Sequence, residues 1–309
     1  MTPTLFSVSY AGLWGQQALD LPAFLRKAAQ LGYPAVELMG KRPHLSVLDC
    51  GQRELVELRA VAQDLGLQIA TVAGYTDFTL ATGMETPAVE VQIAYVRRLA
   101  EMARVLDAKI VRIFTGYTTQ ADAGQRDWDT CVRAVRECAR LAADSGVILG
   151  VQNHHDVGVS VDAYVEFLDD VAHSNCRAMF DPWSVALHGE DLYTAAQRLA
   201  PRMVQTTLAD YVRLPRFAYQ PGLVNYKPLD TMVRAVPLGQ GFLDLAGFFR
   251  GLQAGGFDGY VAYEMCSPLR GGGSEANLDA TARGALGSIG QLISSSRDPQ
   301  QTAVTGSMS

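Results

Sequence analysis

The 309-residue sequence is poor in the residue patterns that most often mark a secreted, membrane-bound or thiolate-metal protein. It has five cysteines, no two of them with C-x-x-C spacing, so neither a disulfide framework nor a thiolate zinc site is expected. No hydrophobic run approaches the ~18 residues of a membrane span, and the N-terminus lacks the basic and apolar regions of a signal peptide. We therefore expect a cytoplasmic protein without a membrane partner.

Positive charge is also in short supply. The chain carries 26 Lys and Arg against 32 Asp and Glu, for a net charge of -6. An acidic surface repels phosphate backbones, so we expect no nucleic-acid partner. The hydrophobic fraction of 48% is ordinary for a chain that buries a large core.

What the sequence does contain is a regular alternation of short β-type runs and longer helical patterns. Strands are predicted at 6–12, 35–40, 67–75, 109–117, 147–154, 176–182, 203–210 and 260–265. Helices are predicted at 21–32, 52–65, 87–106, 124–144, 161–173, 191–200, 242–256 and 275–294. Eight of each predict an α/β protein, a single-domain (β/α)8 TIM barrel. A doubly wound open sheet is the alternative; it usually has fewer strands, and no Gly-rich phosphate loop follows the first strand.

The predicted barrel domain covers residues 1–296. A polar, proline-bearing segment at 211–240 interrupts the alternation after the seventh strand. It is predicted to be a long loop that covers a substrate or contacts another subunit, and the second reading implies a homo-oligomer. Residues 297–309 have the composition of a disordered tail.

Polar side chains stand at the carboxyl ends of the predicted strands, where a barrel of this kind places its active site. The fifth strand leaves an apolar run directly into the five polar residues Gln152, Asn153, His154, His155 and Asp156. Other strands end near Glu37, Arg112, Asp181, Gln205, Asp210 and Glu264. Carboxylates, amide oxygens and imidazoles together suit a divalent cation such as Mn, Mg, Co or Zn.

Five segments of the chain resemble the xylose isomerase-like barrels. They are QNHHD (152–156), MFDPWS (179–184), TTLAD (206–210), AVELMG (35–40) and the block 236–264. That block is the most specific, with a Gly-x-Gly turn, an apolar helix, Gly-Phe-Asp-Gly and a strand ending in Glu. The family includes sugar phosphate isomerases and epimerases, ketose 3-epimerases, inosose dehydratases and the catalytic subunits of C-glycoside deglycosidases. The resemblance extends to about residue 295.

The resemblance implies four metal ligands, Glu, Asp, His and Glu, at the ends of strands five to eight. Asp181 and Glu264 match two of them. Gln152 stands where the first Glu is usual and Thr207 where the His is usual, with Gln205 two residues earlier on the same face. The predicted ligand set is therefore Gln152, Asp181, Gln205 and Glu264, with a weakened metal affinity because neutral oxygens replace a carboxylate and an imidazole.

Catalytic roles are predicted for three residues: His155 as a general acid or base, Glu264 as a base, and Glu37 as an acid that contacts the substrate. Substrate contacts are predicted for His154, His188, Arg213 and Trp183. Each has a structural alternative that the sequence leaves open. A histidine can bond a loop or be solvated, a tryptophan can pack in the core, and an arginine can be surface charge.

The predicted function is a metal-assisted isomerase or epimerase of a sugar or sugar-like polyol, which abstracts a proton next to a carbonyl. Because Gln152 replaces a glutamate, only Glu264 remains as a ligand carboxylate able to act as a base, which argues against a two-carboxylate 3-epimerase. One alternative is a lyase, dehydratase or C-glycoside-cleaving enzyme that acts on an oxidised sugar. Another is a catalytically lapsed barrel that binds a sugar, supported by Gln152 and Thr207.

Overall fold

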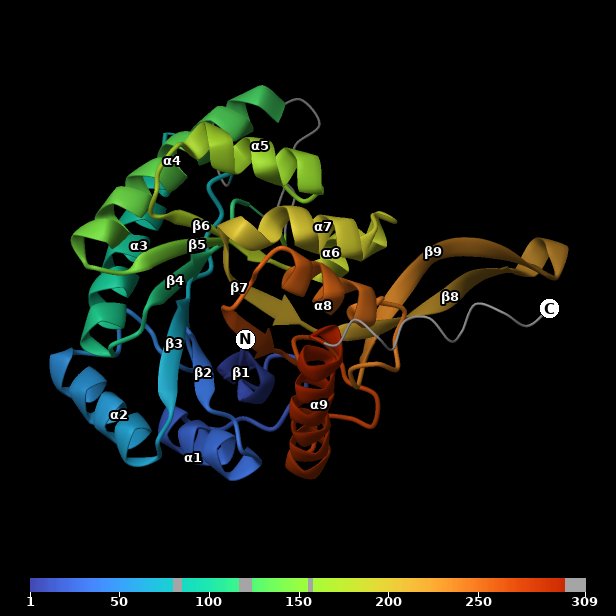
Figure 1. The fold of residues 1–309 in the computed structure, drawn as a ribbon. Helices are drawn as coiled ribbons and strands as arrows, with labels where there is room; N and C mark the ends of the chain where they lie inside the picture. Colours follow the sequence, from blue (N-terminus) through green and yellow to red (C-terminus); the bar gives the residue numbers. More distant parts are fainter. Residues whose placement is uncertain (80–84, 117–123, 155–157, 298–309) are drawn as a thin grey trace.

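Eight parallel strands close into a barrel surrounded by helices (Figure 1), in a computed structural model that describes residues 1–79, 85–116, 124–154 and 158–297. The strand order around the ring is β1-β10-β7-β6-β5-β4-β3-β2, which confirms the predicted (β/α)8 barrel. The barrel strands are β1 (Thr2–Phe6), β2 (Ala35–Met39), β3 (Gln68–Ala73), β4 (Ile110–Ile113), β5 (Ile148–Gln152), β6 (Cys176–Phe180), β7 (Met203–Leu208) and β10 (Tyr260–Tyr263).

The helices begin and end close to their predicted bounds because polar caps and glycines delimit them. The α-helices are α1 (Leu21–Leu31), α2 (Gln52–Asp64), α3 (Ala88–Val105), α4 (Gly124–Asp144), α5 (Val161–Val171), α6 (Pro182–Leu187), α7 (Leu192–Leu199), α8 (Leu245–Ala254) and α9 (Glu275–Ser296). The Ser160 hydroxyl accepts a hydrogen bond from the Ala163 amide and so caps the start of α5. Gly32 ends α1 with a φ of 90°, a left-handed conformation that favours glycine.

The first strand lies earlier in the chain than predicted. It covers Thr2–Phe6, and residues Ser7–Tyr10 form a 3-10 turn. Residues 6–11 are buried in this turn, so their apolar side chains reflect burial at the mouth of the barrel and not an extended strand. Its serines hold the turn at the mouth of the barrel: the Met39 amide donates to Ser7 Oγ over 2.8 Å, and the Met265 amide donates to Ser9 Oγ over 2.9 Å.

The insert after the seventh strand is a β-hairpin, whereas a loop was predicted. Strands β8 (Asp210–Gln220) and β9 (Asn225–Val236) pair antiparallel, joined through a 3-10 turn at Pro221–Leu223. The hairpin projects away from the barrel, and most of its residues are exposed (Figure 1). Prolines at 215 and 228 interrupt the alternation of apolar and polar residues that is typical of strands, so the sequence pattern predicts a loop.

Asp210 anchors the base of this hairpin. Its Oδ2 accepts hydrogen bonds from the amides of Gly239 and Gly241, at 2.9 and 2.8 Å. A Cβ at Gly241 would lie 1.9 Å from Asp210 Oδ1, so only glycine allows this close approach. The Gly-x-Gly turn noted in the sequence therefore has a structural role, and the Asp210 carboxylate holds that turn.

The barrel strands carry buried polar side chains, among them Glu37, Thr71, Gln152 and Gln205, between their apolar residues. Arg112 on β4 is the largest fully buried side chain in the described part of the chain. Among the described residues, no helix combines the length and the apolar character needed to cross a membrane.

Candidate active site

A cavity of about 220 Å³ lies at the carboxyl end of the barrel. Its walls come from strands on opposite sides of the ring, as expected for the active site of this fold. Its polar lining includes Arg112 on β4, Gln152 at the end of β5, His154 just after it, and Glu264 just after β10. The other lining residues are Phe6, Val8, Trp14, Lys41, Tyr75, Phe114 and Cys266.

The guanidinium of Arg112 is the most constrained charge in the cavity. Its Nη1 donates to Gln152 Oε1 over 2.7 Å, and its Nε lies 3.8 Å from Glu37 Oε1. The guanidinium carbon is 4.2 Å from the ring centre of Phe114 and 4.8 Å from that of Tyr75. Aromatic faces attract a cation and exclude water from it. A positive charge is therefore fixed at the wall of the cavity in a nearly dry environment.

Gln152, Asp181 and His154 form a hydrogen-bonded chain beside this arginine. Gln152 Nε2 donates to Asp181 Oδ2 over 3.1 Å, and His154 Nδ1 lies 2.8 Å from the same oxygen. The pKa of His154 is raised: burial lowers it, but the hydrogen bond to Asp181 and the charges of Asp181 and Glu264 outweigh that effect. Asp181 thus orients the imidazole from behind while the ring faces the cavity.

Trp183 restricts the same imidazole from another side. Its indole Nε1 lies 3.2 Å from His154 Nδ1, and its ring centre lies 4.7 Å from that of Tyr211. An indole N–H can only donate, so Nδ1 serves Asp181 when it carries the proton and Trp183 when it does not. The Trp183 side chain is half-buried and is not among the lining residues of the cavity.

Glu264 presents a buried carboxylate to the cavity. Burial raises its pKa, as does the charge of Asp181, while His154, a Cys266 hydrogen bond and Arg112 act in the opposite direction. The Cys266 thiol donates to Glu264 Oε1 over 3.1 Å. A raised pKa suits a carboxylate that must exchange protons near neutral pH.

Glu37 and Gln205 lie deeper in the barrel and do not line the cavity. Gln205 Nε2 donates to Glu37 Oε2 over 2.5 Å, and Gln205 Oε1 accepts from the Thr71 hydroxyl over 2.6 Å. Burial raises the pKa of Glu37 to about 7, against the opposing effect of Arg112. Gln205 thus holds the Glu37 carboxylate next to the Arg112 guanidinium.

The donors expected for a divalent metal do not form a ligand set in this arrangement. The described residues contain no group of three or more His, Cys, Asp or Glu side chains that could hold an ion. The oxygen of Gln152 accepts from Arg112, and both amide atoms of Gln205 bind other side chains. Thr207 Oγ1 is buried with no hydrogen-bond partner in the described part of the chain, but one hydroxyl is a weak ligand.

The remaining predicted site residues lie apart from the cavity or outside the described part of the chain. His155 is not among the described residues, so its predicted catalytic role stays a prediction. His188 ends α6 with an exposed side chain, and Arg213 on β8 places its guanidinium 4.5 Å from the ring centre of Phe242. Arg213 lines a different cavity together with Glu190 and other residues.

Several cavity residues received no predicted role, although their positions share one sequence signal. Tyr75, Phe114 and Cys266 each follow a barrel strand by one to three residues, and Lys41 follows β2 by two. Lys41 and Cys266 lie one residue past the predicted strand ends at 40 and 265, and Tyr75 and Phe114 lie within the predicted strands 67–75 and 109–117.

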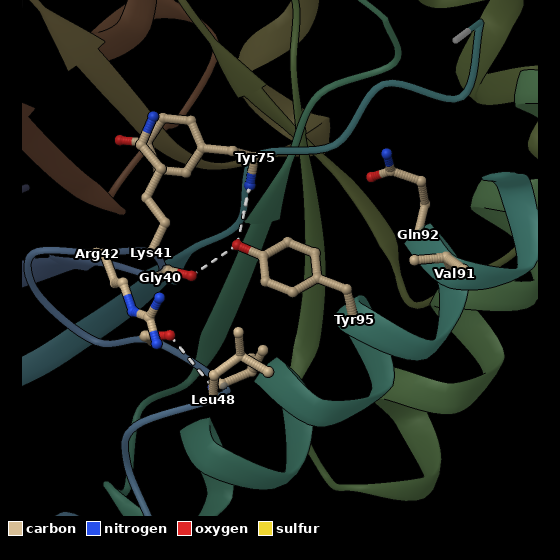
Figure 2. A pocket seen from close by; sticks show the side chains of 10 residues that line it. Gly40, Lys41, Arg42, Leu48, Tyr75, Val91, Gln92 and Tyr95 are labelled. Atoms are coloured by element: carbon tan, nitrogen blue, oxygen red, sulfur yellow. Dashed lines mark hydrogen bonds between the residues drawn. The ribbon is translucent and has the colours of Figure 1, made fainter. Parts of the chain in front are cut away.

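A second, larger cavity of about 570 Å³ adjoins the first and shares the wall made by Lys41 and Tyr75. Lys41 Nζ lies 3.9 Å from the ring centre of Tyr75. Tyr95 lines the same cavity, and its hydroxyl donates to the Gly40 carbonyl over 2.7 Å (Figure 2). Burial lowers the pKa of Lys41, and the charge of Arg112 lowers it further.

Comparison with known proteins agrees with this geometry at the level of the family. The family model described as the xylose isomerase-like TIM barrel matches residues 25–286, so the chain belongs to that family. No curated protein sequence is similar enough to the chain to count as a match.

Solved structures share the fold at low sequence identity. A D-psicose 3-epimerase from Clostridium cellulolyticum H10, solved with D-tagatose, has a TM-score of 0.73 and 18% identity, covering 95% of this chain and 99% of that one. An L-ribulose 3-epimerase has a TM-score of 0.72 and 18% identity, with 96% and 95% covered. A probable 3-DHS dehydratase, AsbF of Bacillus anthracis, has a TM-score of 0.70 and 18% identity, with 94% and 99% covered.

Proposed function

We propose that this chain is an enzyme that abstracts a proton next to a carbonyl group of a sugar or sugar-like polyol. The observation that carries the proposal is that one cavity presents a buried carboxylate, Glu264, together with the guanidinium of Arg112 and the imidazole of His154. A base, a fixed positive charge and a second proton-transfer group are the components that an enediolate-forming reaction needs.

In this proposal Glu264 removes the proton from the carbon next to the carbonyl. Negative charge then develops on the carbonyl oxygen, and the positive charge of Arg112 stabilises it in a dry cavity, where charge interactions are strong. His154, held by Asp181, gives a proton to the carbonyl oxygen and takes the proton of the neighbouring hydroxyl, so that one proton passes between the two oxygens. Glu264 returns its proton to the adjacent carbon, which exchanges the positions of carbonyl and hydroxyl.

The arrangement favours isomerisation over 3-epimerisation. Epimerisation through a planar intermediate needs a proton donor on the face opposite the base, whereas an isomerase can use one base for both carbons. Glu264 is the one carboxylate among the described lining residues of the cavity. The epimerases among the structural neighbours support a sugar-like substrate through the shared fold, and their own reactions are not transferred to this chain.

A lyase or dehydratase is the second candidate. An elimination needs a base to remove a proton and an acid to protonate the leaving oxygen, and Glu264 and His154 line the same cavity. The dehydratase among the structural neighbours is consistent with elimination on this barrel.

Deuterium incorporation tests both candidates. The protein would be incubated in D2O with a panel of aldoses, ketoses, their phosphates and 3-keto-glycosides, and the products followed by NMR. Deuterium next to the carbonyl of a recovered or isomerised sugar supports isomerisation, and an unsaturated or ring-opened product supports the lyase. Binding of a sugar without exchange or product would indicate a lapsed barrel.

Glu264→Gln is the variant that locates the base in this assay. It should reduce the rate of exchange by about a thousandfold or more, since it removes the proton acceptor and keeps the side-chain shape. Glu57→Gln, at an exposed position on α2, is the matched control and should leave the rate unchanged.

A further inference from the structure

We infer that the Arg112 guanidinium takes the place of a divalent metal in this barrel, so that the site works with a fixed organic cation. This inference rests on the proposed function for its catalytic meaning, but it concerns which cation the site holds, and that can be measured without activity.

The first argument is the occupation of the donors. Arg112 Nη1 is 2.7 Å from Gln152 Oε1, the oxygen that a metal at this strand end would need. Gln152 in turn donates through Nε2 to Asp181 Oδ2, so its amide is oriented by the arginine on one side and the carboxylate on the other. A glutamate at 152 would accept at both oxygens and could not donate to Asp181. The amide therefore fits a site that holds arginine.

The second argument is the charge balance. Arg112 has at most 2% of its side chain exposed, and it lies 3.8 Å from the Glu37 carboxylate. A divalent ion beside this guanidinium would meet strong repulsion in a poorly solvated environment. The two cations are alternatives for one place.

The third argument is how firmly the guanidinium is held. Phe6, Tyr75 and Phe114 place their ring centres 5.4, 4.8 and 4.2 Å from the guanidinium carbon. Such aromatic surroundings suit arginine, and the two phenylalanine rings offer a metal no oxygen ligand. The side chain is thus built into the site.

The inference is tested by metal binding to the full-length protein without a histidine tag, purified without chelator. Elemental analysis of the wild type should find well under 0.1 equivalent of Mn, Co, Zn or Ni, and titration with Mn²⁺ followed by electron paramagnetic resonance should show no tight site. One equivalent of a tightly held metal in the wild type would overturn the inference.

A variant that is expected to gain metal binding provides a second test. The double variant Arg112→Ala, Gln152→Glu removes the guanidinium and restores a carboxylate beside Asp181, Glu264 and His154. It should bind Mn²⁺ at least tenfold more tightly than Gln152→Glu alone, in which the arginine remains. Equal binding by the two variants, with both folded by circular dichroism, would also overturn the inference. If the double variant fails to fold, the wild-type measurement decides.

A second inference comes from the projecting hairpin, and it is independent of the site. We propose that the hairpin is an arm that docks on a second copy of this chain. Eight large apolar side chains on it are exposed: Leu214, Phe217, Tyr219, Leu223, Val224, Tyr226, Leu229 and Met232. An isolated two-stranded hairpin is only marginally stable in water, and so many exposed apolar groups indicate a contact surface.

Charge complementarity identifies the partner as a second copy. Residues 211–236 contain four basic residues and one acidic residue, for a net charge of +3, so the rest of this -6 chain carries -9. The base of the arm adjoins an acidic surface: Arg213 lines a cavity of about 380 Å³ together with Glu190, Asp191 and Asp244. A neighbouring cavity of about 270 Å³ shares Glu190 and Asp191.

The position of this acidic surface fits a twofold arrangement. Each arm, with strands of 11 and 12 residues, extends about 30 Å at the usual rise per strand residue. Because the acidic surface lies at the root of the arm, two copies can lay their arms across each other's surfaces in a self-complementary contact. Prolines interrupt the open edges of the hairpin, so the arm docks by its faces and not by adding strands.

Light scattering coupled to size exclusion tests the arm. The wild type at about 50 µM should have twice the chain mass of 33.4 kDa, and the dimer should weaken as salt rises. Phe217→Ser with Tyr226→Ser should give a monomer, whereas Val91→Ser, an exposed apolar position on α3, should not. A monomeric wild type, or a dimer that the arm variant leaves intact, would overturn the proposal.

A charge swap separates the second copy from other partners. Arg216→Glu with Lys227→Glu should give a monomer, as should Glu190→Lys with Asp191→Lys. Mixing the two variant proteins should restore a heterodimer, because each arm then meets a surface of opposite charge on the other variant. Failure of the mixture to associate, from variants that are folded and monomeric, would contradict this contact.

Discussion

Arg112 and Gln152 lie 2.7 Å apart, Nη1 to Oε1, at the carboxyl ends of neighbouring strands β4 and β5. This contact joins two side chains that both line the cavity, a guanidinium and the amide that the sequence predicts as a metal ligand. The chain belongs to the xylose isomerase-like family. The side chains at this site differ from the ligand pattern that is usual in that family.

The ion pair between Arg112 and Glu37 should be strongly coupled in stability. Above pH 7, where Glu37 is ionised, Arg112→Met leaves its carboxylate buried without a cation, and losing one partner of a buried pair costs about 3–5 kcal/mol. The double variant Glu37→Gln, Arg112→Met should lose less free energy of unfolding than the sum of the single variants. Urea unfolding of the four proteins measures this, and simple additivity would show that the pair is not coupled.

Stability should fall as pH rises from about 4.5 to about 7. The pKa of Glu37 is raised to about 7, mainly because burial disfavours its charged form, so the folded state holds this proton more tightly than the unfolded chain does. The resulting stabilisation is complete below the unfolded pKa and is lost as pH passes the folded one, at about 1.4 kcal/mol for each unit of difference. The direction at Glu264 is the same.

Unfolding midpoints across this pH range check the effect. Glu37→Gln should flatten the dependence on pH, because the amide does not titrate, while the exposed Glu57→Gln should keep it. An unchanged slope in Glu37→Gln would assign the dependence to other groups.

Cys266 should set the acidic limb of the pH–activity profile. Its thiol donates to Glu264 Oε1 over 3.1 Å and so opposes the rise in the pKa of Glu264 that burial causes. Cys266→Ala removes this donor, so the pKa should rise and the limb should move to higher pH. Cys266→Ser keeps a donor and should leave the limb near its wild-type position. A limb that shifts equally in both variants would argue that the effect is one of packing.

The contact between Gly241 and Asp210 should control the base of the hairpin. Gly241→Ala places a Cβ 1.9 Å from Asp210 Oδ1, and such overpacking costs about 1–3 kcal/mol. Gly284→Ala, a helical position on α9 with open space around it, should instead be neutral or stabilise by about 0.5–1 kcal/mol. Thermal unfolding compares the two variants, and equal effects would contradict the role given to Gly241.

The barrel could be predicted from the sequence because its strands and helices each carry a local signal. Apolar runs of fitting length, Ser160 as a cap and Gly32 as a stop all lie in the sequence itself. The first strand was placed too late because Phe6–Gly12 is apolar owing to burial at the mouth of the barrel. The sequence did not predict the hairpin because its prolines interrupt the alternation of apolar and polar residues. The pairing of β8 with β9 also leaves no signal in the spacing of residues along either strand.

The site was only partly predictable, because which side chains bind each other depends on how strands close the ring. The strand ends identified Gln152, Asp181 and Glu264 as neighbours, and they lie at one end of the barrel. That Gln205 turns to Glu37 and Thr71, and that Arg112 binds Gln152, follows from contacts across the barrel interior. No periodicity along the chain encodes those contacts.

Solvent exchange into the proposed substrate, with and without divalent metal, tests the central claim most directly. Deuterium incorporation next to the carbonyl of the best sugar in the panel would be followed for the wild type treated with EDTA and for the same sample after addition of Mn²⁺. We predict that the two rates agree within about twofold and that both are lost in Glu264→Gln. Exchange that stops with EDTA and returns with Mn²⁺ would contradict an arginine-centred site.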